Sequence, residues 1–177
     1  KQCIDGLQKA VDEANRQFRD LEALYRIRSH TVEYETLNVK EVLDEIASVH
    51  QTSTDRQLFI ADQWPTIRGE RFLLRQILSE LINNGFKYNR SKIKKVEIGC
   101  HETADKRLEI VIRDNGIGID SQYHEHIFHI FKRLHTEKEY EGTGIGLAIV
   151  RRAVRRLGGE LRIESAVGQW TTFVISL

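Results

Sequence analysis

The stretch 114–120 reads Asp-Asn-Gly-Ile-Gly-Ile-Asp and follows an alternating run, Leu108 to Ile112, that predicts a β-strand. Glycine at 116 and 118 allows positive φ, and it lets a ligand approach the backbone without meeting a Cβ atom. A carboxylate at Asp114 that points into a cleft can accept a hydrogen bond from an amine. The same pattern also fits a plain Asn-Gly turn that leaves a strand. Alone, it leaves both interpretations open.

A second glycine cluster, 142–148 (GTGIGLA), precedes an amphipathic pattern that predicts a helix over 147–157. The first N–H groups of a helix have no partner inside the helix, and the helix dipole favours an anion there, so this cluster suits a polyphosphate. It is not the dinucleotide fingerprint, which needs a glycine where Leu147 stands, and no Gly-Lys-Ser/Thr follows as in a Walker loop. Together, the two clusters predict a nucleotide held from both ends, with the polar chain between them as a cover.

Upstream, the segment 71–89 carries apolar residues at 73, 74, 77, 78, 81 and 82, which is the recurrence of a helix. Glu80 and Asn84 are four residues apart and therefore project from one face, and Lys87 follows a turn later. An amide oxygen, together with phosphate oxygens and water, makes a suitable shell for Mg²⁺. A solvated polar stripe is the alternative interpretation of this face.

Four segments in this order resemble the ATP-binding domain of sensor histidine kinases, within the wider group that contains the gyrase, Hsp90 and mismatch-repair ATPases. They are 80–88 (ELINNGFKY), 114–120 (DNGIGID), 127–134 (IFHIFKRL) and 142–149 (GTGIGLAI). The run 133–149 is most similar to soluble, phytochrome-like kinases. The resemblance implies an α/β fold, a two-layer sandwich of a mixed sheet and helices of the Bergerat type, with ATP and Mg²⁺ as cofactors.

The resemblance also implies a role for each site residue. Asp114 is expected to select adenine, Asn84 to hold Mg²⁺, and Lys87 and Arg133 to neutralise phosphate charge. The expected catalytic residues are Glu80, Asn84, Lys87 and Arg133. The expected nucleotide-binding residues are Asn84, Lys87, Tyr88, Asp114, Gly116, Gly118, Gly142, Thr143, Gly144, Gly146, Leu147 and Thr171, with Asn84 as the metal ligand. A core tyrosine at 88 and a solvated arginine at 133 are the alternatives, and the charged segment 134–142 is expected to order over the nucleotide as a lid.

Three positions depart from the family pattern. Glu80 stands where most histidine kinases have asparagine, whereas the related ATPases place their general base there. The family's Gly-x-Gly-Thr is replaced by 168–171 (GQWT), which leaves an adenine contact from Thr171 open. Gly85 replaces the usual alanine, at about 1 kcal/mol of helix propensity.

Residues 1 to about 29 carry a seven-residue apolar repeat, which predicts a helix that packs along another helix. The two seam positions hold Ile4, Val11, Phe18 and Tyr25, and Leu7, Ala14 and Leu21. A helix that lies on the core of its own domain is the alternative. The resemblance implies that 1–30 is the C-terminal helix of a dimerisation and phosphotransfer hairpin, and that 31–177 is the catalytic ATP-binding domain.

The remaining patterns predict a mixed sheet with helices on one face. Asn38 is expected to cap the helix that follows it, and Trp64-Pro65 to break the chain. Strands are predicted over 32–37, 57–60, 96–101, 108–114, 160–165 and 171–177, and helices over 39–50 and, more briefly, 120–128.

Composition excludes several classes of function. The formal net charge is +1, so the balance of charge does not point to nucleic acid or to an anionic membrane. With no long apolar run, and with Cys3 and Cys100 in no metal-type spacing, we expect a cytoplasmic location and no membrane contact by this fragment. None of the seven histidines lies in the Ser-His-Glu-Leu-Arg acceptor motif of the family. Metal binding by the histidines at 124, 126 and 129 is disfavoured, and the arginines at 151, 152, 155 and 156 are interpreted as a solvated face or a partner patch.

The leading hypothesis is therefore the catalytic domain of a sensor histidine kinase, which transfers the γ-phosphate of ATP to a histidine on a hairpin largely outside this sequence. Its expected partners are its own hairpin, a response regulator and, in the full-length protein, a second copy of itself. Two alternatives remain. One is an ATP-hydrolysing clamp in which Glu80 activates water, and the other is a regulatory module that binds nucleotide without turnover.

Overall fold

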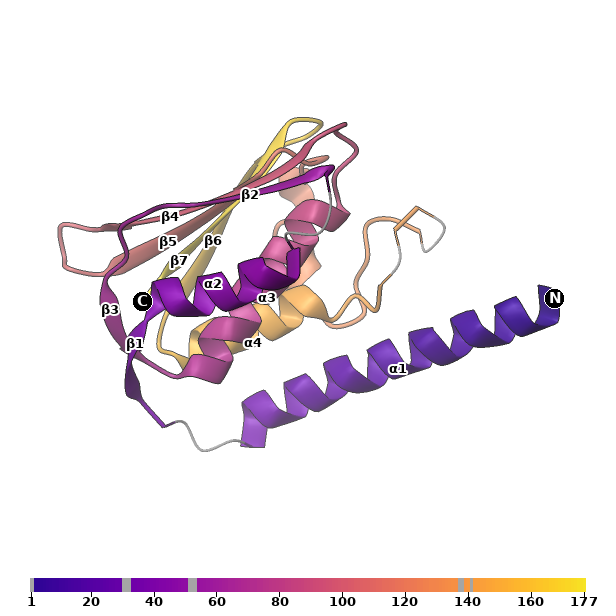
Figure 1. Ribbon diagram of the computed structural model, residues 1–177, viewed down its shortest axis with the longest axis horizontal. Coiled ribbons are helices and arrows are strands. Elements are labelled where there is room, and N and C mark those ends of the chain that lie inside the picture. Colours follow the sequence, from indigo (N-terminus) through magenta and orange to yellow (C-terminus); the bar gives the residue numbers. More distant parts are fainter. Residues whose placement is uncertain (1, 30–32, 51–53, 137–138, 141) are drawn as a thin grey trace.

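The computed structural model describes residues 2–29, 33–50, 54–136, 139–140 and 142–177. In these ranges, one sheet has five strands and forms one layer of the domain (Figure 1). In sheet order, the strands are β2 (Arg56–Ile60), β4 (Lys94–Glu102), β5 (Leu108–Asp114), β7 (Trp170–Ser176) and β6 (Glu160–Ala166). β2 pairs with β4 in parallel, and the other neighbours are antiparallel, so the predicted mixed sheet is confirmed.

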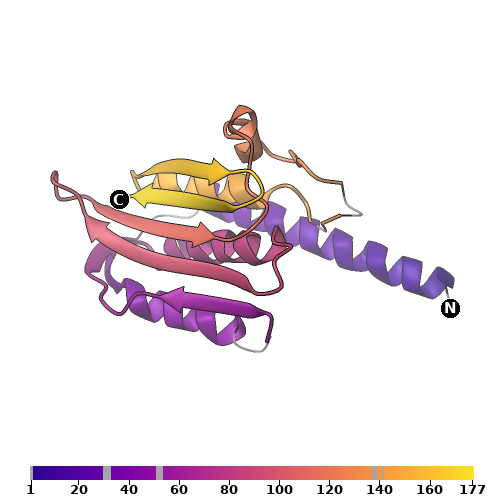
Figure 2. The same ribbon diagram turned by 90° about the horizontal axis from the view of Figure 1, so that it is seen from above.

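Three helices cover one face of this sheet, and the two layers are clearest when the molecule is seen from above (Figure 2). They are α2 (Val39–His50), α3 (Arg71–Lys87) and α4 (Gly146–Arg156). α3 begins where the Glu70 carboxylate accepts hydrogen bonds from the backbone N–H groups of Phe72 and Leu73, at 3.2 and 2.7 Å. This arrangement confirms the two-layer α/β sandwich.

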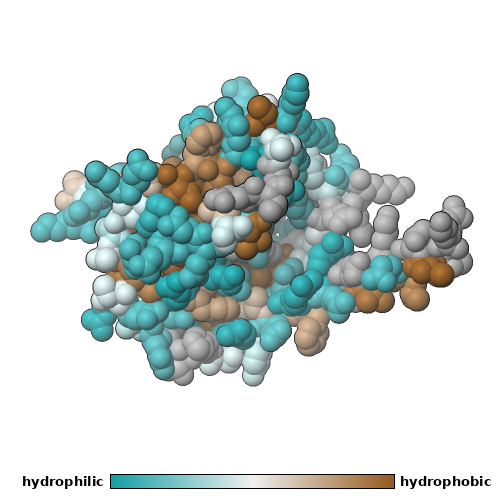
Figure 3. All heavy atoms as spheres, in the orientation of Figure 1, coloured by the Kyte–Doolittle hydropathy of each residue, from teal (hydrophilic) through white to brown (hydrophobic). Residues whose placement is uncertain are grey.

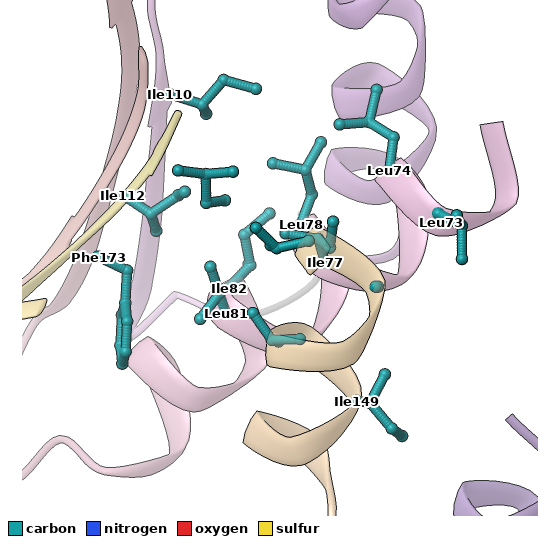
Figure 4. Close-up of a cluster of buried hydrophobic side chains, with 14 of the residues drawn as sticks. Leu73, Leu74, Ile77, Leu78, Leu81, Ile82, Ile110, Ile112, Ile149 and Phe173 are labelled. Carbon is teal, nitrogen blue, oxygen red and sulfur yellow. The ribbon is translucent and has the colours of Figure 1, made fainter. Parts of the chain in front are cut away.

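The core lies between α3, α4 and the sheet (Figure 4). Ile110, Ile112 and Phe173 extend from the sheet toward the apolar side of α3, and Ile149 reaches it from α4. The side chains that α3 buries are Leu73, Leu74, Ile77, Leu78, Leu81, Ile82 and Phe86. Each large aliphatic side chain buried in this way contributes roughly 1.5–3 kcal/mol, so the apolar stripe of α3 fixes which face of the helix remains for polar chemistry.

Two short elements differ from the sequence prediction. β1 (Glu35–Asn38) and β3 (Thr66–Gly69) form a separate antiparallel pair, and β3 was not predicted because its four residues lack an alternating apolar pattern. The strand predicted over 32–37 thus lies at 35–38 where it is described, while residue 32 is outside the described residues.

The single short helix predicted over 120–128 is wrong. The chain instead forms two 3₁₀ turns, η1 (Ser121–Tyr123) and η2 (His126–Phe128). Asp120 caps the first turn through the backbone N–H of Gln122, at 3.0 Å. The second turn buries Ile127 and Phe128 in the core, and the tighter 3₁₀ winding allows two adjacent apolar residues to point inward over so few residues.

α1 (Gln2–Ser29) packs on the domain through its C-terminal end, where Leu24 and Ile27 are buried, and its N-terminal half extends beyond the body (Figure 1). Arg156 of α4 donates hydrogen bonds to the carbonyl oxygens of Ile27 and Arg28. The apolar seam predicted from the heptads lies on another side and is exposed: Ile4, Leu7 and Phe18 are 70%, 69% and 70% exposed (Figure 3). Among the described residues, no helix is long and apolar enough to span a membrane.

Candidate functional site

The polar face of α3 carries the first group of predicted site residues. A recess between α3, α1 and the second glycine cluster is lined by Glu80, Asn84 and Lys87. These side chains face the recess because the apolar residues on the opposite side of α3 pack in the core. Asn84 also lines the neighbouring pocket that contains Asp114. This asparagine therefore lies at the junction of the two hollows.

Asp114 ends β5 and lies half-buried in its pocket. Its Oδ1 atom accepts a hydrogen bond from the backbone N–H of Gly116 at 2.8 Å. Burial raises the pKa of Asp114 to about 6, although the backbone N–H groups of Gly116 and Thr171 act in the opposite direction. The group is thus a hydrogen-bond acceptor at neutral pH that becomes a donor only in mild acid.

The glycine at 85 explains how α3 can lie against this carboxylate. A Cβ atom at Gly85 would come within 2.7 Å of Val96 Cγ2 and 3.1 Å of Asp114 Cβ. The helix thus approaches the ends of β4 and β5 more closely than a side chain permits. The departure from alanine noted in the sequence is therefore a packing requirement at the site.

The pocket around Asp114 has mostly apolar walls. Ile117, Ile119, Ile127, Leu147 and Phe173 line it, together with Tyr88 and the turn glycine Gly118. Gly118 has φ +68°, and an added Cβ would strike the backbone of Ala166, so no larger residue fits there. Apolar walls with one carboxylate acceptor suit a flat heteroaromatic ring that bears an amine.

The second glycine cluster lines the neighbouring recess. Gly142, Thr143, Gly144 and Gly146 all contribute to it, at the start of α4. Ile145 is the N-cap of α4 and, in the part of the chain that the structure describes, provides no side-chain cap, so the first N–H groups of the helix remain available. These N–H groups lie in the same recess as Lys87, and their binding of an anion stays a prediction.

Glu80 lies in the same recess and is mostly buried. Burial raises the pKa of Glu80 to about 7, the charge of Asp20 raises it further, and the charge of Lys87 lowers it. A Cβ atom added at Gly146 would meet the Glu80 carboxylate, which places this group directly at the start of α4. A carboxyl that is partly protonated at neutral pH suits proton transfer.

Arg133 lies against the second glycine cluster, since a Cβ atom added at Gly144 would come within 3.0 Å of Arg133 Cγ. It lines the pocket of Asp114, and its guanidinium donates a hydrogen bond to the carbonyl oxygen of Tyr140. Its predicted contact with a terminal phosphate stays a prediction, because here the side chain holds the segment around Tyr140. Thr171 is buried, pairs with Asp114 in the register of β5 and β7, and lines the same pocket, with its hydroxyl 3.1 Å from that of Ser165.

The structure also adds residues that the sequence did not predict. Asp20 and Arg16 of α1 line the recess that contains Glu80 and Lys87, and no local motif could have indicated them because α1 is distant in sequence. His135 and Leu134 line the pocket of Asp114. Their position could have been suspected, since they begin the segment predicted as a lid.

Residues 69–177 match the family described as histidine kinase-, DNA gyrase B- and HSP90-like ATPases. The chain belongs to this family. It is 32% identical over 160 residues to cyanobacterial phytochrome A of Nostoc sp., and 37% identical over 142 residues to the phytochrome-like protein Cph1 of Synechocystis sp.. These matches cover 89% and 79% of this chain but only 21% and 19% of the relatives, so the chain corresponds to about a fifth of their length.

The fold of this family member is also found in solved structures. Full-length ShkA in complex with AMPPNP superposes with a TM-score of 0.77 at 22% identity, over 99% of this chain and 38% of that one. The resemblance to sensor histidine kinases that the sequence predicted is confirmed by the family match and by these relatives.

Proposed function

We propose that this chain is the ATP-binding catalytic part of a sensor histidine kinase, which positions ATP so that its γ-phosphate is transferred to a histidine. The observation that carries the proposal is the pair of adjoining hollows that share Asn84. One has apolar walls and the Asp114 acceptor, and the other has Lys87 and the start of α4. A base fits the first and a polyphosphate the second.

In this proposal, Asp114 accepts a hydrogen bond from the adenine amine, while Ile119 and Phe173 contact the faces and edges of the base. Tyr88 borders the base, and the turn glycines Gly116 and Gly118 keep the backbone close to it. Lys87 and the N–H groups at Gly144 to Leu147 neutralise the phosphates, and Gly142 and Thr143 border them. Phosphoryl transfer needs little covalent chemistry from the protein, so positioning and charge stabilisation account for the catalysis.

Asn84 is the residue that we propose as the Mg²⁺ ligand. The amide oxygen would be the ligand, while the Nδ2 atom, which is buried and has no hydrogen-bond partner among the described residues, would be left to donate to a phosphate oxygen or to water. It lies where base and phosphates meet, and a metal that keeps most of its waters needs few protein ligands. Bound there, Mg²⁺ would supply charge neutralisation between the phosphates.

We further propose that residues 1–30 are the C-terminal helix of a dimerisation and phosphotransfer hairpin, and that residues 31–177 are the catalytic domain. The exposed apolar seam of α1 supports this division, because such a stripe needs a partner helix. A homodimer, a response regulator and a cytoplasmic location follow from the same assignment, and the phytochrome-like relatives support it.

Radiolabelled ATP tests the transfer. The chain is incubated with [γ-³²P]ATP and Mg²⁺, alone and with an upstream helix that bears the acceptor motif joined before residue 1. We expect acid-labile, base-stable label only in the extended protein, because the phosphorus needs a nucleophile held within about 3.5 Å. Acid-labile label on the chain alone would contradict the assignment of the acceptor to the hairpin.

A second candidate, an ATP-hydrolysing clamp, is favoured by one observation: the Glu80 carboxylate lies against Gly146 at the start of α4, where burial raises its pKa to about 7. A carboxyl with that pKa, at the start of α4, is suited to activate a water molecule. Phosphate release that Glu80→Gln abolishes, with no label on the extended protein, would favour this activity. ATP binding with neither label nor release would favour a regulatory module.

A further inference from the structure

The described part of the predicted lid, residues 134–136, 139–140 and 142, is attached to the C-terminal end of α3 through a cluster of three rings. The Tyr140 ring lies 5.0 Å from the Tyr88 ring at an angle of 52°, and 5.3 Å from the His135 ring at 63°. Tyr88 and His135 are 6.2 Å apart. Tilted and edge-on pairs at these separations are favourable arrangements of aromatic rings.

Polar contacts fix the same residue from outside. Arg90 Nε donates a hydrogen bond to Tyr140 Oη at 3.0 Å, and its guanidinium carbon lies 5.7 Å from the centre of the ring. Arg90 also forms an ion pair with Glu139 at 3.4 Å. The tyrosine is therefore held both by its ring and by its hydroxyl.

The backbone of the segment is folded on itself in a way that presents Tyr140. The Glu139 carboxylate accepts hydrogen bonds from the N–H and hydroxyl groups of Thr136, at 3.2 and 3.1 Å. The N–H groups of Glu139 and Tyr140 both donate to the Thr136 carbonyl oxygen at 3.1 Å, and Arg133 donates to that of Tyr140. These contacts are all made between described residues of the segment itself or with the adjoining Arg133.

The three rings do not have equal access to the site. Tyr88 and His135 line the pocket of Asp114. Tyr140 lies behind them and lines a separate outer hollow with Lys87 and Glu139. Lys87 in turn lies with its Nζ atom 4.6 Å from the centre of the Tyr88 ring. The side chain of Tyr140 can therefore influence a bound base through the two rings that line the pocket.

We propose that Tyr140 is a positioning residue that holds Tyr88 and His135 as one wall of the base pocket and so slows the release of the nucleotide. The proposal rests on the proposed function, since it assumes that a purine occupies the pocket. Aromatic rings add contact with a purine only while they are held in place, and Tyr140 with Arg90 supplies that restraint. Because the wall must move before the base can leave, the effect belongs to the dissociation rate.

The test uses the rate at which bound radiolabelled ATP is lost after a chase with unlabelled ATP. Tyr140→Leu keeps similar bulk but removes the ring, and we expect dissociation to become about tenfold faster. Tyr140→Phe keeps the ring and loses only the bond to Arg90, so we expect an increase of about two- to threefold. Arg90→Gln should resemble the phenylalanine variant, and His135→Ala the leucine variant. Association rates should stay unchanged in all four.

Tyr123→Ala serves as the matched control, because this tyrosine is 40% exposed on η1 and takes no part in the ring cluster. The melting temperature of each nucleotide-free variant identifies loss of fold. A parent chain that does not bind ATP would refute the proposed function itself. If the parent binds ATP, then Tyr140→Leu with an unchanged dissociation rate, or Tyr140→Phe as fast as Tyr140→Leu, would refute the positioning role.

Discussion

The Thr143 hydroxyl donates a hydrogen bond to the Asp20 carboxylate and so joins the glycine cluster to a helix 123 residues earlier in the chain. Asp20 also lies close enough to Glu80 for its charge to raise the pKa of that carboxyl. α1 therefore places a negative charge in the recess proposed for the phosphates, although α1 lies outside the region that matches the family. The position of α1 and the binding of a triphosphate are thus expected to influence each other.

Asp20→Asn should lower the pKa of Glu80 and strengthen ATP binding. The substitution removes a like charge from the recess, and a gain of about three- to tenfold in affinity is expected at low ionic strength. Calorimetry measures the affinity, and carboxyl ¹³C chemical shifts follow the titration of Glu80. Glu22→Gln, on the exposed side of α1, is the control for net charge. Unchanged or weaker binding would show that Asp20 does not oppose the phosphates.

Glu80→Gln should change how stability depends on pH in the nucleotide-free chain. The pKa of Glu80 is about 7 in the folded state and near 4.5 when unfolded. Because the folded state binds more protons between these values, ionised Glu80 makes the free energy of unfolding fall as the pH rises through that window. The free energy of unfolding of Glu80→Gln, relative to that of the parent chain, should therefore rise by up to about 3 kcal/mol between pH 4.5 and pH 7.

Urea unfolding at a series of pH values measures this difference. Glu97→Gln, an exposed residue of β4, is the matched control and should show no such growth. A constant difference between Glu80→Gln and the parent would contradict the raised pKa.

Asp114→Asn should remove most discrimination between ATP and GTP. The carboxylate accepts a hydrogen bond from the adenine amine but meets the keto oxygen of guanine with repulsion, which is worth roughly 1–3 kcal/mol when buried. We expect ATP to bind the parent at least about tenfold more tightly than GTP. Equal affinities in the parent chain would refute the assignment of this pocket to adenine.

The affinity of the parent chain for ATP should also weaken as the pH falls below about 6, the pKa of Asp114. Binding then requires the carboxylate form, so the loss approaches about tenfold per pH unit. The profile of Asp114→Asn supplies the baseline, because it retains the titration of the nucleotide itself. Parallel profiles for the two proteins would contradict the role of the carboxylate.

Gly85→Ala should destabilise the domain by about 1–3 kcal/mol, even though alanine improves helix propensity by about 1 kcal/mol. The added methyl group would press on Val96 at 2.7 Å and on Asp114 at 3.1 Å, so ATP affinity should fall as well. Gly6→Ala in α1 is the control, since nothing lies within 4 Å of its added Cβ. Thermal unfolding measures the stability of each variant and calorimetry measures its affinity for ATP. Both should fall in Gly85→Ala and stay unchanged in Gly6→Ala.

Asn84→Ala should abolish the part of ATP affinity that depends on Mg²⁺. Asn84 lies at the junction of both hollows, whereas its neighbour Asn83 is exposed, lines the recess of Lys87 but not the pocket of Asp114, and contacts Ser79 at 3.5 Å. Titrations with Mg²⁺ and with EDTA measure the difference for Asn84→Ala and for the control Asn83→Ala. A metal dependence that persists in Asn84→Ala would assign the ion to other ligands.

Local sequence patterns were sufficient for the principal elements and for the centre of the site. The apolar recurrence along 71–87 predicts α3 because burial of one stripe requires that period, and it leaves Glu80 and Asn84 on the other face. The alternating run before Asp114 predicts β5 for the same reason. Regular elements carry their period within a few residues, so the sequence alone indicates them.

Contacts between distant segments have no such signature. The apolar repeat of α1 predicts a helix but not that Leu24 and Ile27 pack on α4 while the seam stays exposed, or that Asp20 meets Thr143. Likewise, the charged residues of 134–142 predict a cover, whereas the attachment of Tyr140 to Tyr88 and Arg90 depends on where α3 ends. The amino-acid sequence thus determined the elements, the family and the residues at the centre of the pocket. Their partners were decided by tertiary packing, because burial of the core brings together side chains whose separation along the chain carries no periodic signal.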